Sequence, residues 1–72
     1  MVALEKAVLG ILKREPAGLS NGKIYELLRK EYPSEKYHKK KMYATLHRLE
    51  KEGVVNSKRT HYVKVWRAIK SR

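Results

Sequence analysis

Few side chains in this sequence could perform acid–base or nucleophilic chemistry. Three histidines, His38, His47 and His61, are the candidate bases, and the sequence offers neither an Asp to orient them nor a Cys nucleophile. His38 and His47 are nine residues apart, which fits neither one face of a helix nor a familiar metal-ligand spacing. The four glycines form no phosphate-binding loop, because no Gly-Lys-Ser or Gly-Lys-Thr occurs. We therefore expect no enzymatic activity, no metal and no cofactor.

Positive charge is the strongest chemical signal. The 72 residues include 18 Lys and Arg against seven acidic residues, a formal net charge of +11. Residues 1–36 carry a net charge of +2 and residues 37–72 a net charge of +9. A basic half beside a nearly neutral half indicates a face that binds a polyanion such as nucleic acid. The alternative is a lysine-rich surface that only keeps the protein soluble.

The elements that must position this charge follow from the spacing of apolar residues. Three stripes repeat at helical intervals, and their members are Leu4, Val8, Ile11 and Leu12, then Ile24, Leu27, Leu28 and Tyr32, then Met42, Leu46 and Leu49. They predict helices over about 2–15, 21–31 and 39–52. Ser20 is a good N-cap for the second helix, and His38 is the preferred N-cap for the third. Gly53 is the expected left-handed residue after the third helix.

After Gly53 the apolar spacing changes to that of strands. Val54-Val55 and Tyr62–Arg67 are rich in β-branched and aromatic residues, and they predict a hairpin over about 54–67. The polar segment 56–61 between them is the predicted, charged tip. Leu19 is a candidate for a third, very short strand. The chain is thus expected to be one α+β domain over residues 1–72.

Three helices followed by a hairpin, with the charge on the last helix and the hairpin, predict a winged helix-turn-helix. In that fold the third helix enters the major groove of DNA and the hairpin, or wing, lies along the backbone. Trp66, the only tryptophan, is expected to close the core between hairpin and helices rather than to stack on bases.

Residues 41–55, Lys-Met-Tyr-Ala-Thr-Leu-His-Arg-Leu-Glu-Lys-Glu-Gly-Val-Val, resemble the recognition helix and following strand of PadR-like transcription regulators. That family has a Tyr, a Leu three residues later and a Leu-Glu-x-x-Gly ending. Residues 7–12 look like the family's first helix. The resemblance implies DNA binding and transcription regulation. The C-terminal helices through which PadR-like regulators dimerise and sense ligands have no counterpart before Arg72, so we expect no small-molecule ligand.

On a helical wheel the third helix presents one face opposite its core stripe, and this face should contact DNA. Lys40 could donate to guanine, and the Ala44 methyl could approach a thymine methyl. Tyr43 either contacts DNA or packs against the second helix. The predicted contacts on this helix are Lys39, Lys40, Lys41, Tyr43, Ala44, His47 and Arg48.

Two further regions complete the predicted interface. The wing contributes Lys58, Arg59, His61 and Lys64, which could reach phosphates or the minor groove; a solvated hairpin tip is the alternative. At the start of the second helix, Ser20 and Asn21 could present free backbone amides to a phosphate. The alternative there is an ordinary N-cap.

The sequence therefore predicts a protein that binds double-stranded DNA, either a small transcription regulator or an architectural factor. An RNA-binding module and a protein-interaction winged helix of a transcription or replication complex are the alternatives. Because the apolar stripe of the first helix is consumed by the core, with Leu9 to spare, we expect a monomer or weak homodimer. No apolar run is long enough to span a membrane, and we expect a cytoplasmic, nucleoid-associated protein. The absence of Gln and Cys is typical of thermophiles and indicates an archaeal-like source.

Overall fold

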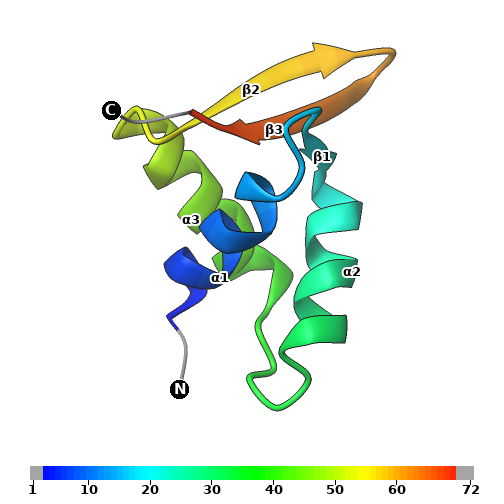
Figure 1. Cartoon of the computed structure of the whole chain (residues 1–72), viewed down its shortest axis with the longest axis vertical. Helices are drawn as coiled ribbons and strands as arrows, with labels where there is room; N and C mark the ends of the chain where they lie inside the picture. Colours follow the sequence, from blue (N-terminus) through cyan, green and yellow to red (C-terminus); the bar gives the residue numbers. More distant parts are fainter. Residues whose placement is uncertain (1–2, 70–72) are drawn as a thin grey trace.

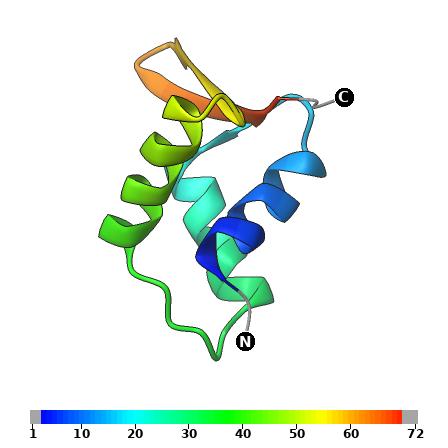
Figure 2. The same ribbon diagram turned by 90° about the vertical axis from the view of Figure 1, so that its left-hand side faces the viewer.

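The computed structural model describes residues 3–69. The elements are α1 (Leu4–Lys13), β1 (Leu19–Ser20), α2 (Asn21–Glu31), α3 (Lys39–Lys51), β2 (Val55–Thr60) and β3 (Val63–Ala68) (Figure 1). The strands form one antiparallel sheet in the order β1-β3-β2. The predicted α+β class is confirmed, including the short strand at Leu19. Figures 1 and 2 show the helices on one side of the sheet, with the β2–β3 hairpin (the wing) extending beyond them.

One core joins the helices to the sheet. Its buried side chains come from every helix and every strand, and they are Ala7, Val8, Ile11, Leu12, Leu19, Ile24, Leu28, Met42, Leu46, Leu49, Val55 and Trp66. Leu9, which the sequence left to spare, packs partly against this core. Most of the apolar stripes predicted from the helical spacing are thus in the core, which Trp66 closes on the sheet side. Leu4, Leu27 and Tyr32 are only partly buried, and buried Ala7 was not part of a predicted stripe. Within residues 3–69 no helix has the length and hydropathy needed to cross a membrane.

The first helix is shorter than predicted. Ala3 is extended and α1 begins at Leu4; the predicted start at Val2 lies outside the described residues. At the other end, the amides of Arg14 and Glu15 donate to the carbonyls three residues back, at 3.2 and 3.1 Å, so the last turn tightens before Pro16. The chain then turns at Gly18, where φ is +96° and a Cβ atom would lie 2.5 Å from Val65 Cγ1. Only glycine fits at this approach to β3.

The start of α2 and the end of α3, both as predicted, are fixed by local hydrogen bonds. The Ser20 hydroxyl caps α2 by accepting from the Lys23 amide at 3.3 Å. At the end of α3, Gly53 has φ +81°, and its amide donates to the Glu50 carbonyl at 3.0 Å. The amide of Val54 donates to the Leu49 carbonyl at 2.9 Å. This is the Schellman arrangement, which turns the chain from α3 into the sheet.

The hairpin covers nearly the predicted residues, but its strands are longer and its turn is shorter than predicted. Its strands pair over six residues each, from Val55 opposite Ala68 to Thr60 opposite Val63. The tip is the two-residue turn His61-Tyr62, so the prediction of a polar tip over residues 56–61 is wrong. Where the hairpin extends beyond the core, neither face of its strands is buried. Polar residues can therefore continue the hydrogen-bonded pairing, and the apolar residues mark only the part of each strand next to the core.

Candidate nucleic-acid interface

The exposed face of α3 is the one predicted from the helical wheel. Met42, Leu46 and Leu49 are completely buried and fix the rotation of the helix about its axis. The side chains on the opposite face lie at the surface, among them Lys40, Ala44, His47 and Lys51. Tyr43, on the flank of this face, is 38% exposed. The helix thus presents polar and cationic groups on a rigid support.

Trp66 brings three of the predicted contact regions together. Its indole is 1% exposed, and its Nε1 donates a hydrogen bond to the side-chain oxygen of Asn21, at the start of α2. The His47 ring of α3 meets it edge to face, with centroids 5.4 Å apart and planes at 85°. The Lys64 ammonium of β3 lies 4.6 Å from the ring centroid. The predicted core role of Trp66 is observed; its role as the junction of α2, α3 and the wing was missed, because these residues are far apart in sequence.

The register of the wing separates its cations onto two faces. Side chains alternate along a strand, and Arg59 is paired with Lys64 while Ser57 is paired with Trp66. Arg59 and Lys64 therefore share the inner face that carries Trp66. Lys58 is paired with Val65 on the outer face. Lys58 and Arg59 were both predicted to lie on the charged tip, but they are neighbours within β2 and point in opposite directions.

A further bond ties the wing to α3. The Ser57 hydroxyl donates to the Glu50 carboxylate at 2.5 Å, and Ser57 lies on the inner face of β2. The inner face of the wing is therefore held beside α3 by both Trp66 and Ser57. Arg59 and Lys64 continue this face beyond the last contact with the helix.

The tip of the wing has an unusual backbone. His61 and Tyr62 have φ values of +48° and +69°, so both occupy the left-handed region. Two-residue hairpin turns of this type favour Asn and Gly, because a Cβ atom in that region costs roughly 1–2 kcal/mol per residue. The Tyr62 side chain is 100% exposed. His61 is one of the predicted DNA contacts, whereas Tyr62 is not.

The start of α2 uses the side chains of Ser20 and Asn21 within the protein, while a phosphate contact through the backbone amides there stays a prediction. The Ser20 hydroxyl is used as the N-cap, and the Asn21 side-chain oxygen accepts the hydrogen bond of the Trp66 indole. Both side chains are therefore committed to bonds within the protein. Their observed roles are to begin α2 and to attach it to the sheet, which is the N-cap alternative for Ser20 and a positioning role for Asn21.

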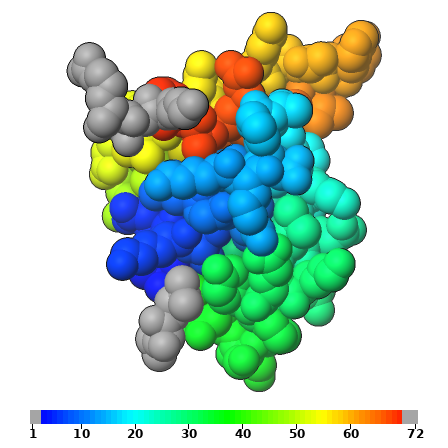
Figure 3. All heavy atoms as spheres, in the orientation of Figure 1, coloured from blue at the N-terminus to red at the C-terminus, as the bar shows by residue number. Residues whose placement is uncertain are grey.

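The other flank of α3 faces α1. Arg48 forms ion pairs with Glu5 of α1 and with Glu52, the latter at 3.9 Å. Lys41 lies seven residues before Arg48, two helical turns away on the same flank. The guanidinium of Arg48 is therefore turned from the predicted interface toward α1. Figure 3 shows α1 and the segment after it covering this side of the molecule.

The cations at the start of α3 and on the wing have no acidic partner within residues 3–69, which is also true of other surface cations such as Lys13 and Lys30. Within residues 3–69, the ion pairs engage Arg14, Lys23 and Arg48. Over the same residues, no carboxylate lies within ion-pair distance of Lys39–Lys41, Arg59 or Lys64. The first turn of α3 holds no acidic residue, although the helix dipole makes three cations unfavourable there without an anion. This region therefore carries an uncompensated positive potential.

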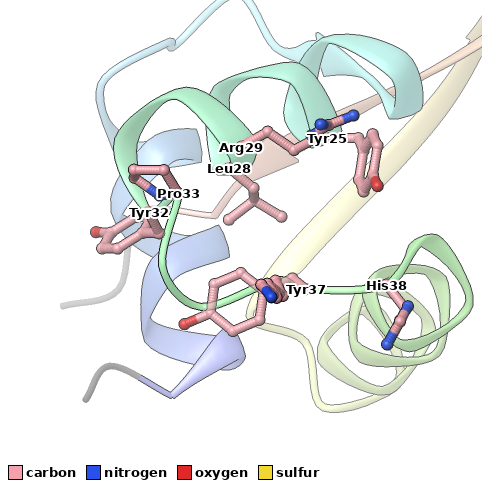
Figure 4. Close-up of a pocket in the computed structure, with 8 residues that line it drawn as sticks. Tyr25, Leu28, Arg29, Tyr32, Pro33, Tyr37 and His38 are labelled. Carbon is pink, nitrogen blue, oxygen red and sulfur yellow. The ribbon is translucent and has the colours of Figure 1, made fainter.

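A hollow of about 410 Å³ adjoins the start of α3 (Figure 4). It is lined by Tyr25, Leu28, Arg29, Tyr32, Pro33, Lys36, Tyr37 and His38. Burial, and secondarily Glu35, raises the pKa of the Tyr37 phenol above 10.0. The Lys39 ammonium lies 5.2 Å from the Tyr25 ring centroid. A cation–π contact thus turns Lys39 toward α2, away from Lys40.

Comparison with known proteins identifies the fold. One solved structure, presented as "Structural insights into the DNA recognition and protein interaction domains reveal fundamental homologous DNA pairing properties of HOP2", superposes with a TM-score of 0.78. The match covers 93% of this chain and 100% of that chain at 21% sequence identity. The fold is a winged helix-turn-helix, as predicted. No protein-family model and no curated protein sequence matches the chain, so the resemblance to PadR-like regulators is not shown.

Proposed function

We propose that this protein binds double-stranded DNA, with α3 in the major groove and the wing against the backbone. The observation that carries the proposal is the junction at Trp66. There the exposed face of α3 and the cationic inner face of the wing are fixed side by side, through His47 and Lys64. Both regions carry cations without acidic partners, as a surface for phosphates requires.

The roles of individual residues follow from how each is held. Lys40, Ala44 and His47 project from a helix whose core side is completely buried, so they are suited to contact base edges. Arg59 and Lys64 lie on the inner face of a strand pair and are suited to phosphates. Lys39 and Lys41, on opposite flanks of the first turn of α3, are suited to the two backbones that border the groove.

The similarity to the solved HOP2 structure supports the proposal at the level of the fold, and that structure is presented as one of DNA recognition. A narrower proposal, transcription regulation of the PadR-like kind, rests on the resemblance of residues 41–55 alone. Selection of bound sequences from random duplexes separates a regulator from an architectural factor. A sharp motif supports a regulator, and strong binding without a motif supports an architectural factor.

Salt dependence of duplex binding tests the proposal. If residues 37–69 contact about five to seven phosphates, log affinity falls against log salt with a slope of about −4.5 to −6. Fluorescence anisotropy of a labelled 20-base-pair duplex from low to physiological salt gives this slope. An RNA duplex of the same sequence is the control, because its deep, narrow major groove does not admit a helix. Equal binding of both duplexes, or a slope near zero, overturns the proposal.

A further inference from the structure

The turn at the end of the wing positions an aromatic ring against the preference of its own backbone. Glycine or asparagine would suit the left-handed φ values of +48° and +69°, yet the chain has His61 and Tyr62 there. Histidine is among the residues that tolerate this region, whereas a bulky aromatic residue is an outlier. Strain of this kind at an exposed tip is typical of sites where the side chain serves a function.

The surroundings of Tyr62 indicate the kind of partner. Tyr62 is 100% exposed and the next residue, Val63, is 46% exposed, so an apolar pair lies in water at the end of the wing. Arg59 and Lys64 lie behind this pair on the inner face. Residues 53–72 contain no acidic residue. An exposed aromatic ring with cations and no acidic residue nearby complements DNA, where phosphates border each groove and the faces of the stacked bases are apolar.

The length of the wing defines which groove the tip can reach. Trp66, which contacts His47 of α3, is four residues from Tyr62 along β3. At about 3.3 Å per residue the tip extends roughly 13 Å beyond that contact. The major groove is about 12 Å wide. With α3 in the major groove, the tip therefore passes the bordering backbone and arrives at the adjacent minor groove.

We propose that the aromatic ring of Tyr62 is a contact site that enters the minor groove and partly unstacks a base-pair step. This inference rests on the proposed function and adds to it a deformation of the DNA. Minor-groove proteins that kink DNA insert apolar side chains between base pairs in this manner, with cations on the flanking phosphates. The preferred step is a pyrimidine–purine step, which unstacks most readily.

Substitutions at Tyr62 separate contact with DNA from the stability of the turn. Tyr62→Ala removes the ring but keeps a Cβ atom at positive φ, and Tyr62→Gly removes both. We expect both variants to bind duplex DNA about tenfold more weakly, because the contact of the ring with the bases is lost. We expect Tyr62→Gly to melt roughly 4 °C higher than Tyr62→Ala, because glycine relieves the turn. Tyr62→Phe keeps the ring and should bind like the wild type.

A fluorescent base reports the deformation itself. 2-Aminopurine, which brightens when it is unstacked, is moved one position at a time along a duplex that the wild-type protein binds. We expect a local rise in fluorescence with the wild type and with Tyr62→Phe, and none with Tyr62→Ala or Tyr62→Gly. Asn56→Ala, an exposed change on the outer face of β2 opposite Arg67 and away from the tip, is the control and should leave affinity and fluorescence unchanged.

The outcomes distinguish this inference from the proposed function. If the wild type binds the duplex but no position brightens, and Tyr62→Ala binds equally well, the tip does not enter the groove and DNA binding still stands. If Tyr62→Ala loses affinity while Tyr62→Gly, with its relaxed turn, binds like the wild type, the effect belongs to turn geometry and the inference fails. If the wild type does not bind duplex DNA, the proposed function fails first.

Discussion

The start of α3 and the wing bring similar cations to the surface but are held by different forces. The core side of α3 carries three completely buried side chains, Met42, Leu46 and Leu49, so the helix cannot rotate without opening the core. The outer half of the wing, residues 58–65, has no buried side chain and is held by the hydrogen bonds between two strands. A rigid helix can hold a side chain against one base edge, whereas a hairpin that flexes is better suited to backbone contacts.

Trp66 is where these two regions depend on each other. Trp66→Ala should lower the free energy of unfolding by about 3–5 kcal/mol, because it leaves a large cavity and frees Asn21 from its bond to the indole. Urea denaturation followed by circular dichroism measures this loss. Tyr43→Ala, an aromatic truncation at the surface of α3, should change the stability by less than about 0.5 kcal/mol. Similar losses for both variants would contradict the view that the wing and helix are joined through the indole.

Two adjacent lysines test whether the helix discriminates sequence. Lys40 lies on the exposed face of α3, and Lys41 lies on the flank toward Arg48 and α1. Lys40→Ala should weaken binding to a preferred duplex by about 1–3 kcal/mol and to random duplexes by less, because a base contact is lost only at the right base. Lys41→Ala should weaken all duplexes similarly, as expected for a phosphate contact.

Anisotropy titrations of both variants on a preferred and a random duplex give this comparison. If Lys40→Ala weakens binding to both duplexes by the same factor, the helix does not discriminate sequence. The protein is then better described as an architectural factor that binds the backbone. His47→Ala is a second test of the same face and should resemble Lys40→Ala.

The smallest expected effect separates the two faces of the wing. Arg59→Ala should make the slope of log affinity against log salt less steep by about 0.9, the value for one phosphate contact. Lys58 is the neighbour on the outer face, opposite Val65, and Lys58→Ala should change the slope by less. Slopes measured over the same salt range decide the matter. Equal changes would show that both faces approach the backbone, and that the wing is not oriented by Trp66 as the structure indicates.

Much of the fold could be predicted because its causes are local. The start of α2 depends on Ser20 and the end of α3 on Gly53, each within a few positions of the helix end it defines. The helical stripes predicted the buried residues, since a side chain repeated every three or four positions must share a face. The end of α1 was predicted two residues late, because the helix tightens before Pro16 within a turn that periodicity does not detect.

The candidate site was predictable as a set of regions but not as a geometry. Arg48 was predicted as a DNA contact on the flank of the exposed face, but its side chain pairs with Glu5, 43 residues away in sequence. Asn21 was predicted to contact a phosphate through its backbone amide, and the structure adds that its side-chain oxygen accepts a bond from the Trp66 indole, 45 residues away. Nothing near either residue in the sequence indicates these partners.

By itself the sequence determined the three helices, the order of the elements and the excess of positive charge in the second half of the chain. These are properties of neighbouring residues and of composition. Only the tertiary structure decided the register of β2 against β3, which places Arg59 on the inner face and Lys58 on the outer face. It also decided that the His47 ring and the Lys64 ammonium meet at one indole. The reason is physical: a shift of one residue in a strand pair reverses every side chain, and the packing of Trp66 in a core built from distant segments selects the register.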